Sequence, residues 1–202
     1  MISLYPDTAR RHNGENVNKK DVSMIYTTRY ISPLGEILLA AEGDALTGLW
    51  FIGQKYFPGF LKEPVTEQGD YPVFPTVQNW LDRYFTNQKP KISELKLAPA
   101  GGEFKKMVWQ ILCEIPYGEL ITYGKISKKI AARLGRPHMS AQAVGGAVGH
   151  NAISIIIPCH RVVGANGSLT GYAGGIDRKI QLLRHEGVSM KNLFVPAKST
   201  AP

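Results

Sequence analysis

The chain has 202 residues, of which 44% are hydrophobic, enough for a packed core in one sizeable domain or two small ones. Its apolar runs are far shorter than the roughly 20 residues that span a bilayer, and its N-terminus lacks a signal-peptide pattern, so we expect a soluble protein with no membrane partner. Two cysteines exclude a disulfide framework and favour a reducing, cytoplasmic setting. With five histidines, no convincing set of metal ligands is found, and no cofactor is expected.

Positive charge is concentrated in the second half of the chain. Residues 1–100 carry 11 Lys and Arg and 11 Asp and Glu, whereas residues 101–202 carry 13 and 5. A basic half suggests a polyanion partner for that half alone. Solvated lysines on helix faces would produce the same imbalance, so both interpretations stay open.

The first half predicts a sheet-plus-helix domain over residues 23–100, preceded by a flexible polar tail over residues 1–22. Its three short runs of β-branched and aromatic residues, bounded by Gly and Pro, predict an antiparallel sheet: MIYTTRYI, GEILLAAE and ALTGLWF. Apolar residues at helical spacing from Val77 to Tyr84 predict a helix, capped by Thr76, that lies on this sheet.

The second half predicts a helix-turn-helix. Residues 99–102, PAGG, break both helix and strand and mark a linker into a second domain, 101–202. After one apolar helix, two short helices are predicted, one capped by Thr122 and the next capped by Ser140 and running to about Gly149. Two short helices around a tight Gly-Arg-Pro turn in a basic domain are typical of this motif.

Small residues are concentrated on one face of the second of these helices. Each interior glycine costs about 1 kcal/mol relative to alanine, so another group must approach this face closely. Tight packing against another helix and entry into the minor groove of DNA explain the pattern equally well. The residues on or beside the face are Ser140, Ala141, Gln142, Ala143, Gly145, Gly146 and Gly149.

The stretch IIIPCHRVV, residues 155–163, carries the cysteine of interest. Its β-branched run predicts a buried strand that Pro158 ends, so Cys159 would lie at a strand end. His160 and Arg161 follow directly, and a base or a cation beside a thiol favours the thiolate. In an extended segment neighbouring side chains point to opposite faces, so we expect a water between Cys159 and His160. An inert buried cysteine is the alternative.

Two further elements are predicted after this stretch. Residues 164–167, GANG, suit positive φ and predict a hairpin between residues 161–163 and 168–172, which would form a wing. A last helix is predicted over residues 177–186 and ends before Gly187.

Five sequence motifs together resemble the O6-alkylguanine-DNA alkyltransferases, also called methylated-DNA-protein-cysteine methyltransferases. They are IPCHRVVG, the TYG and QAVGGAVGHN that precede it, and the GYAGG and HEG that follow. The resemblance covers roughly residues 24–198. It implies an α/β (α+β) fold, with a ribonuclease-H-like N-terminal domain and a winged helix-turn-helix C-terminal domain.

The resemblance implies DNA repair by transfer of a methyl or small alkyl group from O6 of guanine to Cys159, with O4 of thymine as a second candidate. The partner would be duplex DNA bearing the lesion, whose base is flipped out of the stack. A monomer is expected. An alkyl group on sulfur forms a thioether without a carbonyl for water to attack, so each molecule would act once.

The resemblance also implies a role for individual residues. His160 would act through water and be oriented by Glu186, while Tyr123 would donate a proton to guanine N3. Asn151 would tie the recognition helix to the cysteine segment. The pocket for the flipped base would be formed by Val148, Val162, Tyr172 and Ala173. The residues facing DNA would be Ser140, Ala141, Gln142, Ala143, Gly145 and Arg161.

One departure from the family pattern bears on DNA binding, and three other classes of protein compete with this interpretation. Gln142 stands where the family commonly has an arginine that fills the gap left by the flipped base, so phosphate attraction is lost. An alkyltransferase-like protein would lack Cys159, a cysteine hydrolase would turn over repeatedly, and a winged-helix regulator would need longer side chains on its recognition helix.

Overall fold

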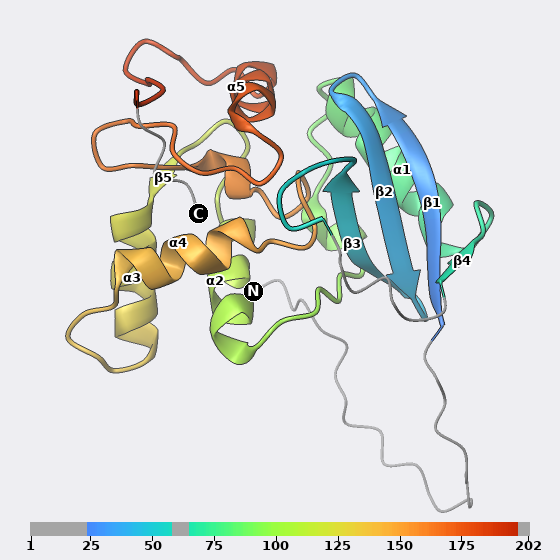
Figure 1. Ribbon diagram of the computed structural model, residues 1–202, viewed down its shortest axis with the longest axis horizontal. Coiled ribbons are helices and arrows are strands. Elements are labelled where there is room, and N and C mark those ends of the chain that lie inside the picture. Colours follow the sequence, from blue (N-terminus) through green and yellow to red (C-terminus); the bar gives the residue numbers. More distant parts are fainter. Residues whose placement is uncertain (1–23, 58–64, 198–202) are drawn as a thin grey trace, which may run out of the picture.

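The computed structural model describes residues 24–57 and 65–197, and the tail expected over residues 1–22 lies outside them. Figure 1 shows a sheet flanked by one helix, beside a group of helices formed by the second half of the chain. The expected α/β class is therefore confirmed. The elements are β1 (Ile25–Ser32), β2 (Gly35–Glu42), β3 (Ala45–Phe51), β4 (Val65–Glu67), α1 (Val73–Phe85), η1 (Ile92–Glu94), α2 (Glu103–Cys113), β5 (Ile121–Thr122), α3 (Tyr123–Arg133), α4 (Ala141–Gly149), η2 (Cys159–Arg161), β6 (Val162–Val163) and α5 (Ile176–His185).

The sheet has the strand order β3-β2-β1-β4. Strands β1, β2 and β3 pair antiparallel, as predicted, and β4 adds a short parallel strand that the sequence did not indicate. Helix α1 covers the sheet with its apolar stripe. It begins at Val73 with Pro72 as its N-cap, so the predicted cap at Thr76 is wrong. Phe74 is fully buried, and burying it extends the helix by one turn toward its N-terminus.

The helix-turn-helix forms as predicted. The Thr122 hydroxyl accepts a hydrogen bond from the Lys125 amide at the start of α3, and the Ser140 hydroxyl accepts one from the Ala143 amide at the start of α4. Both caps satisfy amides that a helix leaves unpaired at its first turn. Helix α2 packs behind this pair, where the fully buried Trp109 donates from Nε1 to the Ala147 carbonyl over 2.9 Å.

The strand predicted over residues 155–157 does not form. The chain turns there instead: Ile155 has φ of 68°, and the Ile157 amide donates to the Ile153 carbonyl over 3.0 Å. These peptide groups bond within the turn, so burial of the apolar side chains requires no ladder. Cys159 accordingly begins the 3-10 turn η2 rather than ending a strand.

The predicted hairpin is also wrong in its pairing. Strand β6 pairs in parallel with β5, and Ser168 forms a bridge with Phe194, because β5 and the C-terminal segment supply the partners. The turn itself is present, since the Gly164 amide donates to the Ser168 carbonyl and Gly167 has φ of +85°. A wing built of paired strands 161–163 and 168–172 is therefore absent from the described residues.

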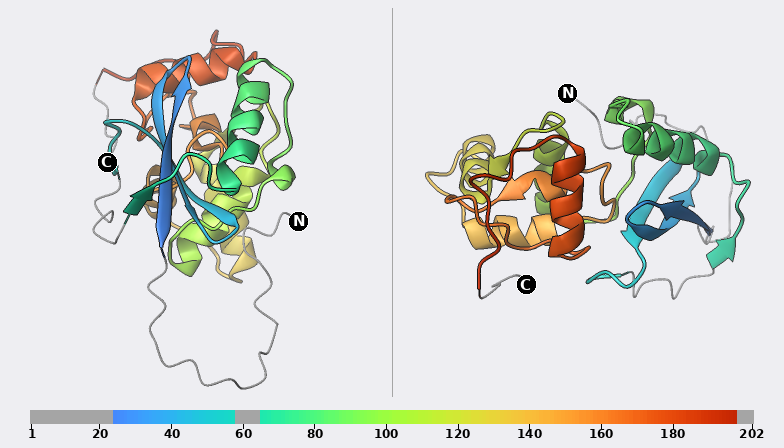
Figure 2. Two further views of the ribbon diagram at one scale, coloured as in Figure 1. Left: turned by 90° about the vertical axis from the view of Figure 1, so that its right-hand side faces the viewer. Right: turned by 90° about the horizontal axis from the view of Figure 1, so that it is seen from above.

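The edge of the N-terminal sheet continues into the segment that precedes the cysteine. Leu49 of β3 donates to the Ala152 carbonyl and accepts from the Ser154 amide, both over 2.9 Å. Helix α5 lies at the same junction (Figure 2), where Arg178 Nε donates to the Leu34 carbonyl over 3.0 Å. The two halves of the chain therefore position the cysteine loop together. Of the helices in residues 24–57 and 65–197, none has the length and apolar character needed to cross a membrane.

Gly48 provides a test of the packing in β3. Its neighbour on the same face of the strand is Trp50, and a Cβ atom at position 48 would lie 1.7 Å from the Trp50 ring. We expect Gly48→Ala to lower the free energy of unfolding by about 1–3 kcal/mol, because the buried indole must move. Urea denaturation measures this change.

The matched control is Gly69→Ala in an exposed turn, where the added carbon makes ordinary contact with Thr28. We expect a change within about 0.5 kcal/mol for this variant. Equal losses in the two variants would contradict the assigned role of Gly48.

Candidate functional site

Cys159 lies in a buried loop next to the end of α4, and its side chain is 4% exposed. Asn151, two residues after α4, places its Nδ2 atom 3.0 Å from the cysteine Sγ and 2.7 Å from the Ile157 carbonyl. This amide ties the end of α4 to the cysteine loop. Burial raises the pKa of the Cys159 thiol, while the Asn151 hydrogen bond and the charge of Lys179 act to lower it.

His160 and Glu186 form a buried pair. The distance from His160 Nε2 to Glu186 Oε1 is 2.7 Å, and neither side chain is exposed. The pair joins η2 to the residue that follows α5, across 26 positions of sequence. The contact that the family resemblance implied between these two residues is therefore present in the geometry.

Arg161 also binds Glu186, which contradicts its expected position facing DNA. Its Nε donates to Oε2 over 2.7 Å, its Nη2 donates to Oε1 over 2.9 Å, and its Nη1 donates to the Ile115 carbonyl over 2.6 Å. Arg161 is 6% exposed. A buried carboxylate requires a compensating charge, and the adjacent guanidinium supplies it in bidentate geometry.

Two further groups complete the surroundings of Glu186. The Tyr84 hydroxyl donates to Oε1 over 2.7 Å, and the Gly118 amide donates to Oε2 over 3.2 Å. Burial alone would raise the pKa of Glu186, but its bonds to His160 and Arg161 outweigh burial and hold that pKa well below its usual range. Glu186 therefore stays ionised at neutral pH.

The protonation of His160 follows from its partner. An ionised carboxylate only accepts hydrogen bonds, so the ring hydrogen of His160 is on Nε2. Burial lowers the pKa of His160, although Glu186 acts in the opposite direction, so the ring is neutral. Its Nδ1 atom is buried and has no hydrogen-bond partner among the described residues. The neutral imidazole of His160 can therefore accept a proton on the lone pair of Nδ1.

Lys179 is a buried cation that the sequence analysis did not single out. Its Nζ donates to the Val162 carbonyl over 2.6 Å and to the Thr170 carbonyl over 3.1 Å. Burial lowers the pKa of Lys179 to about 8, and the nearby Cys159 acts to raise it. One feature of the sequence could have identified Lys179: it lies on the apolar face of α5, three residues before Leu182. Lys179 therefore holds the segment that follows β6 and brings positive charge near the thiol.

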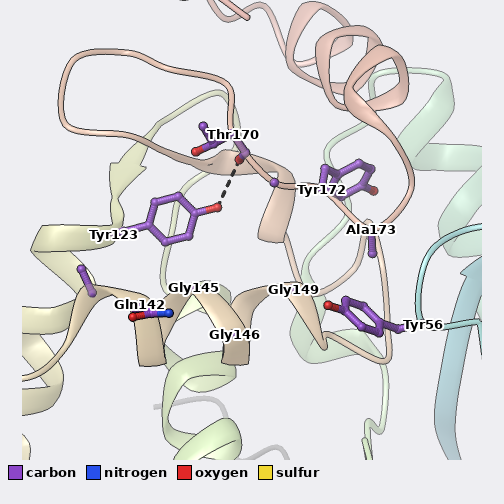
Figure 3. A pocket seen from close by; sticks show the side chains of 11 residues that line it. Tyr56, Tyr123, Gln142, Gly145, Gly146, Gly149, Thr170, Tyr172 and Ala173 are labelled. Atoms are coloured by element: carbon purple, nitrogen blue, oxygen red, sulfur yellow. Dashed lines mark hydrogen bonds between the residues drawn. The ribbon is translucent and has the colours of Figure 1, made fainter. Parts of the chain in front are cut away.

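A cavity of about 520 Å³ opens between α4 and the segment that precedes α5 (Figure 3). It explains the small residues of α4, because the glycine face borders open space: a Cβ atom at Gly146 would meet no atom within 4 Å. Of the two explanations left open above, packing against another helix is therefore wrong. The lining residues are Tyr56, Tyr123, Ala141, Gln142, Gly145, Gly146, Gly149, Thr170, Gly171, Tyr172 and Ala173.

The cavity lies close to the thiol, although Cys159 does not line it. The charge of a Cys159 thiolate contributes to the raised pKa of Tyr123 and of Tyr172, after burial, and both tyrosines line the cavity. Burial is the main cause that raises the pKa of Tyr123 to about 12, so this side chain keeps its proton at neutral pH. Its hydroxyl donates to the Thr170 carbonyl over 3.2 Å.

The remaining predicted residues divide between the cavity and its surroundings. Tyr172 and Ala173 line the cavity, whereas Val148 and Val162 are buried and do not. The residues of α4 expected to face DNA lie on its accessible side. Ser140, Ala141, Gln142 and Ala143 are exposed, and Gly145 is partly exposed.

Comparison with known proteins identifies the family. Residues 25–99 match the family model described as 6-O-methylguanine DNA methyltransferase, ribonuclease-like domain, and residues 103–188 match the model described as its DNA binding domain. The chain belongs to the 6-O-methylguanine DNA methyltransferase family. The resemblance of its motifs to the methylated-DNA-protein-cysteine methyltransferases is thereby confirmed.

Curated relatives of this methyltransferase family cover most of the chain. A methylated-DNA–protein-cysteine methyltransferase of Haemophilus influenzae is 40% identical over 167 residues, which are 83% of this chain and 89% of the relative. One of Methanosarcina acetivorans is 44% identical over 164 residues, or 81% of this chain and 99% of the relative. The crystal structure of Mycobacterium tuberculosis OGT in complex with DNA superposes with a TM-score of 0.67 at 39% identity, covering 81% of this chain and 92% of that one.

One wall of the cavity comes from the N-terminal half, which the motifs of the methyltransferase family did not indicate. Tyr56, in the loop after β3, stacks on His150 with ring centroids 4.1 Å apart, and the Lys55 amide donates to the Ala173 carbonyl over 2.9 Å. Figure 3 shows Tyr56 facing the cavity beside Gly149. A single aromatic residue in a loop has no periodicity that could predict this position. Within the described ranges, no group of three or more His, Cys, Asp or Glu could hold a metal ion.

The contact between Arg161 and Glu186 leads to a stability prediction. We expect Arg161→Leu to lower the free energy of unfolding by about 3–5 kcal/mol, because it leaves a buried carboxylate without its compensating charge. Urea denaturation at neutral pH measures the loss.

The matched control is Arg136→Leu, in the exposed turn between α3 and α4. Its effect should stay within about 0.5 kcal/mol. If the two substitutions cost the same, Arg161 does not stabilise the buried site.

Proposed function

We propose that this protein repairs DNA by transferring a methyl or small alkyl group from O6 of guanine, with O4 of thymine as a second substrate, to Sγ of Cys159. The proposal depends above all on the neutral His160, whose Nδ1 is free while its Nε2 is bound to the ionised Glu186. This arrangement supplies a base for the thiol proton beside a cysteine that lies near a cavity. The volume of about 520 Å³ is within the roughly 300–1,000 Å³ of small-molecule sites.

The first step would be the removal of the thiol proton. Nδ1 of His160 accepts it through a bridging water, and the ionised Glu186 stabilises the imidazolium that forms. Lys179 and the Asn151 amide stabilise the thiolate, since both act to lower the pKa of Cys159. These two groups partly offset burial, which disfavours the charged form.

The second step would be an in-line displacement at the alkyl carbon. The bond from Sγ to carbon forms as the bond from carbon to O6 breaks, and the electron pair passes to the purine. Tyr123 donates its hydroxyl proton toward guanine N3, so the base leaves as a neutral molecule, and the thiol proton that His160 accepted returns through water to the Tyr123 oxygen. In the described structure this hydroxyl donates to the Thr170 carbonyl, and it would exchange that partner for the base. The resulting thioether has no carbonyl for water to attack, so the protein is consumed.

DNA would approach the exposed side of α4. Duplex DNA hides O6 within the stack, so the base must be flipped out into the cavity lined by the glycines of α4 and by Tyr172. Part of the positive charge of the second half does not face DNA. Arg161 and Lys179 are buried, and Lys129 and Arg133 form ion pairs with Glu114. The dependence of binding on salt should therefore be weaker than a net charge of +8 suggests.

The proposal also includes the oligomeric state, the form of DNA, the cellular compartment and the domain boundary. We expect a monomer that acts on double-stranded DNA without a metal or cofactor, in the cytoplasm, where a reducing environment keeps Cys159 a thiol. We place the boundary between its two domains at residues 100 and 101, next to the Gly101-Gly102 pair. A cysteine hydrolase is the strongest rival, since it would use the same pair of cysteine and histidine, but it would release more than one product per protein.

Alkyl transfer can be measured directly. Incubation with duplex DNA containing O6-methylguanine should increase the mass of the intact protein by one methyl group, with no further product however long the reaction runs. Intact-protein mass spectrometry gives both results. Cys159→Ser should abolish the gain.

The matched control is Cys113→Ser. Cys113 lies in α2, where burial raises the pKa of its thiol to about 12, so this variant should keep the full gain. Repeated release of product by the wild-type protein would instead identify a hydrolase.

Gln142 leads to a prediction about affinity. Gln142→Arg should tighten binding to duplex DNA and steepen the salt dependence by about one unit of slope, because it adds one phosphate contact on the exposed side of α4. Fluorescence anisotropy at several salt concentrations measures both quantities.

Gln181→Arg is the control, because it adds the same charge on the exposed side of α5. It should change neither the affinity nor the slope by a comparable amount. An equal effect of both substitutions would show that position 142 has no special place at the DNA.

A further inference from the structure

Tyr84 links the N-terminal half of the chain to the catalytic pair. It lies in α1, 102 positions before Glu186, and its hydroxyl donates to Glu186 Oε1 over 2.7 Å. The same oxygen lies 2.7 Å from His160 Nε2 and accepts from Arg161 Nη2 over 2.9 Å. Tyr84 therefore shares one carboxylate oxygen with the histidine that would receive the thiol proton.

The Tyr84 ring is held in place on every side. It is 1% exposed, it stacks on Trp80 with centroids 5.6 Å apart, and it meets Tyr117 edge-on at 6.0 Å. Its backbone carbonyl lies 2.8 Å from His185 Nε2. Burial, followed by the charge of Glu186, raises the pKa of Tyr84 well above its usual value, so the hydroxyl remains a donor at any working pH.

A donor on a carboxylate oxygen competes with the other donors for its negative charge. With Tyr84 in place, part of the charge of Glu186 is used on the tyrosine hydroxyl, and less remains for the imidazole. We infer that Tyr84 is a positioning residue that weakens the hold of His160 on a proton and so keeps the imidazole neutral before the reaction. The inference rests on the proposed function, since it assigns this role in the same alkyl transfer.

The other charged and titratable groups around the pair are unchanged when only the tyrosine hydroxyl is removed. Glu186 is faced by Arg161 from η2, by Tyr117 from the loop after α2 and by Tyr172 from the segment before α5, and His185 precedes it in the chain. His160 is faced by Glu186 and Arg161, by Lys179 from α5, by the adjacent Cys159 and by the Tyr172 ring, whose centroid lies 6.4 Å from that of His160. A change in the titration of His160 on loss of the Tyr84 hydroxyl would therefore report the Tyr84 bond.

The experiment uses Tyr84→Phe in the full chain. Without the competing donor, Glu186 favours the imidazolium, so the titration midpoint of His160, followed by ¹⁵N NMR of the imidazole without DNA, should rise. We expect about one pH unit, since one hydrogen bond to a charged group changes a protonation equilibrium by about tenfold. The acid limb of the single-turnover rate on O6-methylguanine DNA should move upward by the same amount.

The matched control is Tyr30→Phe. Tyr30 also donates its hydroxyl to a carboxylate over 2.7 Å, in this case Asp82, but away from the site. It should lower stability without moving the His160 midpoint. If Tyr84→Phe fails to fold, 3,5-difluorotyrosine at position 84 keeps the ring and strengthens the donor, so the midpoint should fall.

The outcomes separate the two claims. A folded Tyr84→Phe protein whose His160 midpoint equals that of the wild type would overturn the inference, and so would an equal shift in Tyr30→Phe. For the difluorotyrosine protein, an unchanged midpoint would also overturn it. A shifted midpoint in a protein whose wild-type form transfers no methyl group would support the link between Tyr84 and His160 and overturn the proposed function.

Discussion

The structure around Cys159 depends on one buried carboxylate. Glu186 accepts five hydrogen bonds, and the donors come from α1, from the loop after α2 and from η2. A buried charge is tolerated only when it is compensated and fully hydrogen-bonded. Since these donors come from three separate parts of the chain, the site forms only when those parts have packed together. The carboxylate thus couples the folding of both halves to the state of His160.

The thiol presents an opposite problem, since burial protects Cys159 but disfavours the charged form that attacks carbon. The structure offsets burial with groups placed at short range, the Asn151 amide and the ammonium of Lys179. Beside them, α4 carries glycines that weaken it as a helix and leave room for the cavity. The buried charges near Cys159 and the glycines of α4 both lower local stability, because the proposed chemistry needs charge at the first place and space at the second. The packing of the sheet, α1 and α2 offsets these losses.

Much of this could be predicted from the residues alone, and the errors have a common cause. The caps at Thr122 and Ser140 were correct because a cap is decided by its own side chain and the amides of the next turn. The strand at residues 155–157 and the paired wing were wrong because a short apolar run is buried equally well in a turn or in a ladder. Arg161 was wrongly placed at the DNA because the sequence does not show which charges pair in space, and in the fold it pairs with Glu186.

The sequence by itself determined the class of fold, the two helices of the helix-turn-helix, the glycine face of α4 and the cysteine that we propose to be reactive. These depend on spacing along the chain, which periodicity and motif record directly. Only the tertiary structure decided which groups besides His160 surround Glu186, that Lys179 lies near the thiol, and that Tyr56 and Tyr84 reach the site from the N-terminal half. These contacts join residues far apart in the sequence, such as Tyr84 and Glu186, 102 positions apart, and no local pattern encodes which distant side chains will meet when the two halves pack.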